Sequence, residues 1–146
     1  MTRINSAIPP KCLTDEHLLA EHREIKRLPS CLRRAMVSGS LRRAPGHFTL
    51  GKGHVLFFLD KMNFTMGRYI LLRDECKRRG LNVADYLGNW FNNTTPPSCM
   101  KDYTPTDKER QLLIARITDR ISQSTKASWH YYGKPITREQ AIRLLT

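Results

Sequence analysis

Hydrophobic residues recur along most of this chain every three or four positions, which is the spacing of one face of an α-helix. In residues 14–28, Leu18, Ile25 and Leu28 share one apolar edge, and Pro29 follows as a helix terminator. The pattern predicts an amphipathic helix over this stretch, with one face in the core and the other in solvent.

The longest periodic stretch runs from Val55 to Gly80. Its apolar positions include Phe58, Met62 and Tyr69 at near-helical spacing, and such Met and Phe content is typical of core packing. Gly80 follows three basic residues and suits the left-handed position after a helix. We expect one central buried helix here.

The last third of the chain carries two helix-start signals. Thr106 with Glu109, and Thr137 with Gln140, have the spacing of a capping box, and apolar positions at helical spacing follow each pair. Residues 81–105 are rich in Pro and Asn and are expected to form an irregular surface connection. No segment shows a clear strand pattern.

The length of 146 residues suits one domain with its own core. The elements predict an all-α, compact single domain over residues 1–146, with about three main helices. Residues 1–13 contain Pro9-Pro10 and are expected to form an extended N-terminal arm, and residues 135–146 a short C-terminal extension.

The charge balance is strongly positive. The chain has 25 Lys and Arg against 13 Asp and Glu, a formal charge of +12, and residues 1–80 hold 16 of the basic and 7 of the acidic side chains. Such an excess indicates a polyanionic partner, with nucleic acid as the first candidate, and it concentrates the positive field in the first half.

The cysteines argue against a structural metal. Cys12, Cys31, Cys76 and Cys99 form no Cys-x-x-Cys pair and have no histidine at zinc-finger spacing. We find no apolar stretch of signal-peptide or membrane-spanning length. We therefore expect reduced thiols in a soluble, cytoplasmic protein that binds no membrane.

Two features suggest chemistry. Glu24 lies beside Arg23 and one turn before Arg27, although a surface ion pair with Arg27 would explain the same pattern. Thr2 is small enough for Met1 to be removed, and the resulting α-amine, with a reference pKa of about 7.7 to 8.0, can attack the anomeric carbon of a deoxyribose to form an imine. Thr is common at this position, so Thr2 alone indicates nothing. An aromatic patch around Tyr132 adds possible contacts to DNA.

Five segments together resemble the phage endonuclease V family of pyrimidine dimer DNA glycosylases. They are Met1–Asn5, Asp15–Ile25, Leu50–Val55 with Phe57-Phe58, Glu75–Asn82, and Trp129 with Tyr131–Lys134. They occur in order over nearly the whole chain.

The resemblance implies a helical domain in which the N-terminal arm inserts between the helices. It implies a bifunctional DNA glycosylase and abasic-site lyase that needs no cofactor and acts as a monomer on lesion-bearing double-stranded DNA, in a phage or bacterial setting. The α-amine of Thr2 would form the imine, and Glu24 would assist departure of the base and proton movement at the sugar. The implied DNA-binding residues are Arg3, Glu16, Arg23, Arg27, Arg116 and Arg120.

Some positions depart from the family pattern. Glu16 stands where relatives have Gln, His22 replaces Tyr or Phe, and Arg120 falls where the family can have Lys. These changes leave two alternatives open: the same chemistry on another damaged or modified base, or a catalytically impaired DNA-binding homologue.

Overall fold

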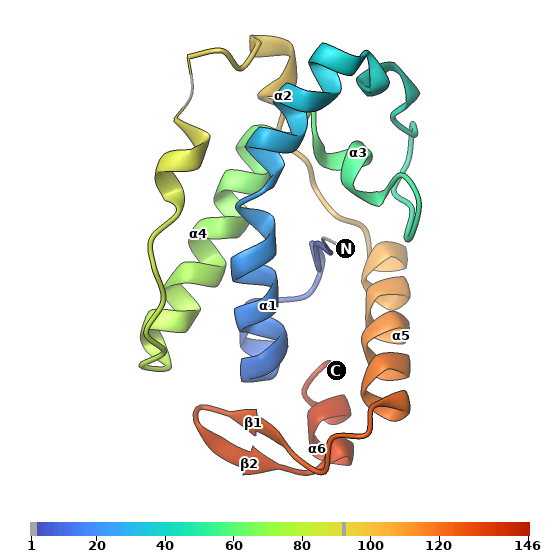
Figure 1. Cartoon of the computed structure of the whole chain (residues 1–146). Helices are drawn as coiled ribbons and strands as arrows, with labels where there is room; N and C mark the ends of the chain where they lie inside the picture. Colours follow the sequence, from blue (N-terminus) through green and yellow to red (C-terminus); the bar gives the residue numbers. More distant parts are fainter. Residues whose placement is uncertain (1–2, 92) are drawn as a thin grey trace.

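Helices build most of the structure, which confirms the predicted fold class (Figure 1). The computed structural model describes residues 3–91 and 93–146. The elements in chain order are α1 (Asp15–Ile25), α2 (Leu28–Ser38), α3 (His54–Phe58), α4 (Met62–Arg78), α5 (Asp107–Gln123), β1 (Trp129–Tyr131), β2 (Lys134–Ile136) and α6 (Arg138–Arg143). Short 3-10 turns at Pro10–Cys12, Ser40–Arg43, Leu87–Trp90 and Pro97–Cys99 interrupt the connections.

The N-terminal arm lies inside the helical domain. Helix α1 packs along α4, and the arm passes between α1 and α5, while the β-hairpin and α6 close one end (Figure 1). Ile4 and Ile8 of the arm are fully buried in the same core as Leu18 of α1 and Leu113 of α5. The arm is therefore held as part of the core, as the resemblance implied. Among the described residues, no helix is both long and apolar enough to span a bilayer.

The two predicted capping boxes are confirmed. Thr106 accepts a hydrogen bond from the Glu109 N–H, and the Glu109 carboxylate accepts one from the Thr106 N–H at the start of α5. Thr137 and Gln140 make the same reciprocal pair at the start of α6. Each box satisfies backbone donors that the first helical turn leaves unpaired.

The prediction that Pro29 ends the first helix is wrong. Helix α1 ends at Ile25, and Pro29 lies in the first turn of α2, where its missing N–H costs no hydrogen bond. Helix α2 spans 11 residues, from Leu28 to Ser38.

The stretch from Val55 to Gly80 is two helices, not one. The chain breaks between Phe58 and Met62, where the Lys101 N–H donates to the Asp60 carbonyl at 3.1 Å. This long-range contact cannot be inferred from periodicity. The predicted stop is confirmed, because Gly80 has φ 73° and the Leu81 N–H donates to the Cys76 carbonyl at 2.9 Å in a Schellman motif.

The antiparallel β1–β2 hairpin was not predicted. Tyr131 pairs with Lys134 across a two-residue turn in which Tyr132 and Gly133 both have positive φ, at 52° and 77°. Asp15 at the start of α1 accepts both turn N–H groups, from Tyr132 at 3.1 Å and from Gly133 at 2.8 Å. A residue distant in sequence therefore stabilises this turn.

Candidate active site

The arm meets α1 at Glu24. The Arg3 N–H donates to Glu24 Oε2 at 3.2 Å, and the Glu24 side chain is half-buried near the end of α1. Thr2, predicted to carry the nucleophile, lies outside the described residues. The structure thus places the residue that follows Thr2 directly against the predicted catalytic carboxylate.

A buried polar network holds the arm behind this contact. Arg68 of α4 donates to both Glu21 oxygens, each at 2.9 Å, and to the Ile8 carbonyl at 2.6 Å. Asn5 donates to Glu21 at 3.1 Å and accepts from Arg116 Nη2 at 3.2 Å. Glu21 is one turn before Glu24 on the same helix, so the arm is fixed to α1 at two successive turns.

A cavity of about 150 Å³ opens between the arm, α1 and α5. Its lining residues are Arg3, Asn5, His17, Ala20, Glu21, Glu24, Arg116, Ile117 and Arg120. Four residues predicted for the site, Arg3, Glu24, Arg116 and Arg120, therefore come together from three elements. Because the arm and α5 are far apart in sequence, periodicity alone could not bring them together.

Arginines outnumber carboxylates in the cavity lining by three to two. Burial, together with the nearby charge of Arg3, lowers the pKa of Arg116 to about 10, so its guanidinium stays charged at neutral pH. In the part of the chain that the structure describes, Glu24 forms no ion pair, and Arg27 is exposed. The surface ion pair with Arg27 considered from sequence is absent from the structure.

His17 also lines the cavity, and sequence reasoning gave it no role. Its ring stacks on Trp129 with centroids 5.1 Å apart, and its Nδ1 lies 3.0 Å from the Thr14 hydroxyl oxygen. Burial is the main cause of the lowered pKa of His17, which favours the neutral imidazole. Because His17 lies one turn before Ala20 and Glu21 on α1, its spacing in the sequence could have indicated that it faces the same cavity.

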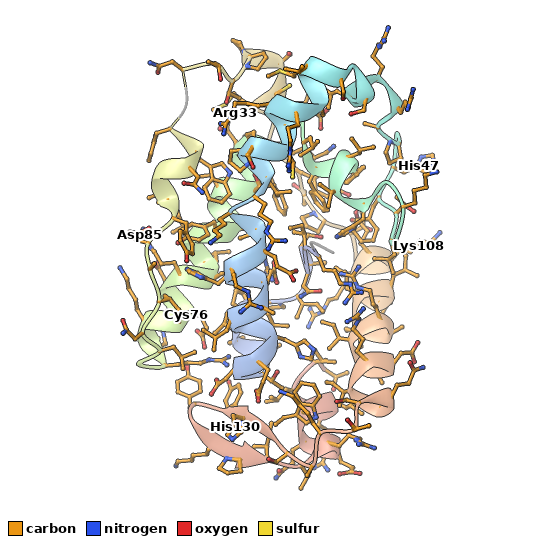
Figure 2. The ribbon with its side chains drawn as sticks, viewed as in Figure 1. Arg33, His47, Cys76, Asp85, Lys108 and His130 are labelled. Atoms are coloured by element: carbon orange, nitrogen blue, oxygen red, sulfur yellow. The ribbon has the colours of Figure 1, made fainter. Side chains whose placement is uncertain are left out.

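The other predicted DNA-binding residues lie outside the cavity lining. Arg23 and Arg27 are exposed near the end of α1. Glu16 accepts hydrogen bonds from the His130 N–H at 3.2 Å and is 3.0 Å from His130 Nδ1, so it ties α1 to the hairpin that carries His130 in Figure 2. His22 is buried and makes a 3.1 Å hydrogen bond with the Tyr69 hydroxyl, away from the lining residues.

The C-terminal aromatic patch packs on a buried arginine. The Arg79 guanidinium carbon lies 4.6 Å from the Tyr131 ring centroid and 4.9 Å from that of Tyr132. Trp129 is 5% exposed. The Trp129 ring is therefore covered by protein, whereas Tyr132 is 40% exposed beside Arg79.

The geometry has the features of an enzyme that acts on a sugar–phosphate substrate. A carboxylate without a cationic partner can stabilise positive charge that develops on a sugar ring, and surrounding arginines can bind phosphates. In residues 3–91 and 93–146, no group of three or more His, Cys, Asp or Glu is placed to hold a metal ion. A carboxylate beside arginines suits an enzyme that cleaves an N-glycosyl bond of DNA, where a sugar lies next to phosphates.

The comparison with known families supports the same class. Residues 1–87 match the family model described as pyrimidine dimer DNA glycosylase, which is more than half of the 146 residues. The chain belongs to the pyrimidine dimer DNA glycosylase family and is a DNA repair glycosylase. The matched part contains Arg3 and Glu24, whereas α5, with Arg116 and Arg120, lies beyond it.

Proposed function

We propose that this protein excises the 5′ pyrimidine of an ultraviolet-induced cyclobutane pyrimidine dimer and then cleaves the abasic site. The observation that best supports this proposal is the 3.2 Å hydrogen bond from the Arg3 N–H to Glu24. Arg3 is thereby held at a carboxylate, and a processed N-terminal amine would belong to Thr2, the residue before it in the sequence.

In the proposed reaction, the Thr2 amine attacks C1′ of the extruded nucleotide, and the N-glycosyl bond breaks with its electron pair going to the base. The amine loses two protons, of which one goes to the departing base and one to the ring oxygen, and an imine to the opened sugar forms. Removal of a C2′ proton then expels the 3′ phosphate by β-elimination, and water hydrolyses the imine. Glu24 stabilises the cationic sugar and moves protons around it.

The cations around the site bind the DNA backbone in this proposal. Arg3, Arg116 and Arg120 contact phosphates beside the extruded nucleotide. The exposed Arg23 on α1 and Arg27, the residue before α2, extend the contact. Extrusion is least costly for a damaged, poorly stacked base, and phosphate contacts make binding depend on salt. The protein acts as a cytoplasmic monomer on duplex DNA, and Glu16 positions the hairpin near the duplex.

Substitution of Glu24 by Gln tests the proposal. Glu24→Gln keeps the acceptor for the Arg3 N–H but removes the charge, so the rate of strand nicking on ultraviolet-irradiated duplex should fall by about 10²- to 10⁴-fold. Binding to the same duplex should persist. Glu139→Gln, at an exposed position of α6, is the matched control and should nick at the wild-type rate. Wild-type nicking by the Glu24 variant would overturn the proposed role.

Duplexes that carry other damaged bases distinguish the proposal from the two alternatives, which are the same chemistry on another base and a catalytically impaired DNA-binding homologue. Preference for the pyrimidine dimer supports the proposal. Faster release of another base would reassign the substrate while preserving the mechanism. Tight binding without nicking of any duplex would identify a catalytically impaired homologue.

A further inference from the structure

His54 accepts a hydrogen bond from the backbone of Ile4, the arm residue that follows Arg3. The Ile4 N–H donates to His54 Nε2 at 3.0 Å, and His54 Nδ1 lies 2.8 Å from the Thr49 carbonyl oxygen. A carbonyl only accepts, so the ring proton is on Nδ1 and the Nε2 lone pair receives the Ile4 N–H. This arrangement requires a neutral imidazole.

The ring of His54 has little freedom to move. It is 2% exposed and meets Phe48 and Phe58 edge-to-face, with centroid separations of 5.6 Å and 5.3 Å. Together with the Thr49 contact, these rings fix the direction of the Nε2 lone pair. His54 therefore offers the arm a rigid acceptor.

Two consecutive backbone N–H groups of the arm thus have separate side-chain acceptors. The Arg3 N–H is directed to Glu24 on α1, and the Ile4 N–H to His54 on α3. Two hydrogen bonds on successive peptide groups fix both the position and the orientation of the chain. The contact with His54 therefore constrains the direction of the backbone at Arg3, where the arm meets Glu24.

We propose that His54 is a positioning residue of this enzyme, whose neutral ring sets the N-terminal amine against Glu24 and whose protonation releases the arm. This inference rests on the proposed function, because it assigns His54 a part in imine formation. His54 does not touch the substrate in this account and acts through the Ile4 backbone.

The charges that face His54 come from two other elements. Burial is the main cause that lowers the pKa of His54 from its usual 6.5, and Arg116 on α5 acts in the same direction. The Thr49 carbonyl and Glu21 on α1 act against it. Since the folded protein binds this proton less readily than the unfolded chain, the anchoring contact stays intact at pH 6.5 and weakens only as the pH falls through the lowered pKa of His54.

The first test compares two substitutions by borohydride trapping on a duplex with a preformed abasic site, which bypasses lesion recognition. His54→Phe keeps an aromatic ring against Phe48 and Phe58 but leaves the Ile4 N–H without its acceptor. The trapping rate should fall by about 100-fold, the loss that a misplacement of about 1 Å can cause, at unchanged DNA affinity. His54→Gln, which restores an acceptor, should recover most of the rate.

His47→Phe is the matched control. His47 is an exposed histidine in the loop before α3, at the edge of the domain in Figure 2, and this variant should trap at the wild-type rate. If His54→Phe traps as fast as wild type at equal thermal stability, the positioning role is overturned.

The pH profile supplies a readout that a purely structural role would not move. Protonation of the α-amine slows trapping in every variant below about pH 8. Wild type should show a second decline at a pH lower than the usual histidine pKa of 6.5, where His54 gains its proton, and His54→Gln should lack it. Identical profiles for the two proteins would contradict the proposal.

Nitrogen–proton NMR spectra keep this inference separate from the proposed function. The Ile4 amide signal should shift as the His54 ring titrates, and it should not titrate in His54→Gln. If wild type fails to trap DNA but the Ile4 signal follows His54, the proposed function fails while the anchoring stands. An Ile4 signal that ignores His54 titration overturns the anchoring, whatever the trapping result.

Discussion

Two arginine–carboxylate clusters lie near opposite ends of α1, and they differ in how completely their charges are paired. Near the start of α1, Arg79 donates to Asp15 and Glu75, each at 2.8 Å, with its side chain fully buried. The Tyr132 hydroxyl adds a 3.1 Å hydrogen bond to Glu75. Every charge in this Arg79 cluster has a protein partner, which is the arrangement that buried ions require.

The cavity near the end of α1 contains the same residue types, but only Glu21 among its carboxylates is paired, with Arg68. Glu24 receives a backbone N–H and forms no ion pair among the described residues, and Arg116 donates to the neutral amide of Asn5. Arg120 is exposed at its rim. The contrast indicates that the Arg79 cluster stabilises the fold, whereas the charges at Glu24 remain available to a ligand.

The largest effect on stability is expected at the Arg79 cluster. Arg79→Met removes the cation shared by Asp15 and Glu75, whose side chains are 8% and 2% exposed. Breaking a buried ion pair from one side costs about 3–5 kcal/mol. Asp15 would then keep only the backbone donors of Tyr132 and Gly133, and Glu75 only the Tyr132 hydroxyl and the exposed Arg78. Urea unfolding should show this loss in the free energy of unfolding.

Arg78→Met is the matched control for that experiment. Arg78 pairs with the same Glu75, but its side chain is 64% exposed, so its loss should cost at most about 1 kcal/mol. Equal losses for Arg78→Met and Arg79→Met would contradict the distinction between a structural cluster and an open one.

A smaller effect, on binding, is expected at the cavity rim. Arg120→Gln removes one phosphate contact, so DNA affinity should fall for all sequences. The negative slope of log affinity against log salt should become shallower by about 1. Folding stability should change little, because Arg120 is exposed. Fluorescence anisotropy over a salt series measures the slope.

Arg110→Gln is the control on the same helix. Arg110 lines a different cavity, beside Pro9 and Pro10. Its substitution should leave the salt dependence of DNA binding steeper than that of Arg120→Gln. Equal slopes for the two variants would mean that α5 contributes only a diffuse charge.

The smallest effect is expected at Glu16. Its contact with His130 is partly solvated, with side chains 21% and 46% exposed, and pairs of this kind contribute about 0–1 kcal/mol. Glu16→Gln should therefore shift the free energy of unfolding by less than about 1 kcal/mol. A loss as large as that of Arg79→Met would show that the hairpin depends on this pair.

Local signals in the sequence predicted much of the fold. The capping boxes at Thr106 and Thr137 and the stop at Gly80 are confirmed, because each depends on residues within one or two turns. The prediction that Pro29 ends a helix was wrong because proline is also favoured in the first turn of a helix. The hairpin was missed because Tyr132 is an unusual turn residue and its backbone is held by Asp15, which is distant in sequence.

The site residues were only partly predicted, because some of them act through contacts between residues that are distant in sequence. Glu24 was singled out by its arginine neighbours, and Arg3, Arg116 and Arg120 were named through the family resemblance. The fold brings all four to one cavity. The residues that hold the arm, among them Arg68 and His54, act through contacts that span 47 to 60 positions of the chain. No spacing rule connects such positions.

Borohydride trapping followed by peptide mapping tests the central claim most directly. Wild-type protein incubated with ultraviolet-irradiated duplex DNA should form a covalent complex, and mass spectrometry should place the adduct on the α-amine of Thr2 in chains from which Met1 has been removed. Trapping at a lysine side chain, or no trapping by correctly processed protein that still nicks the DNA, would contradict the account.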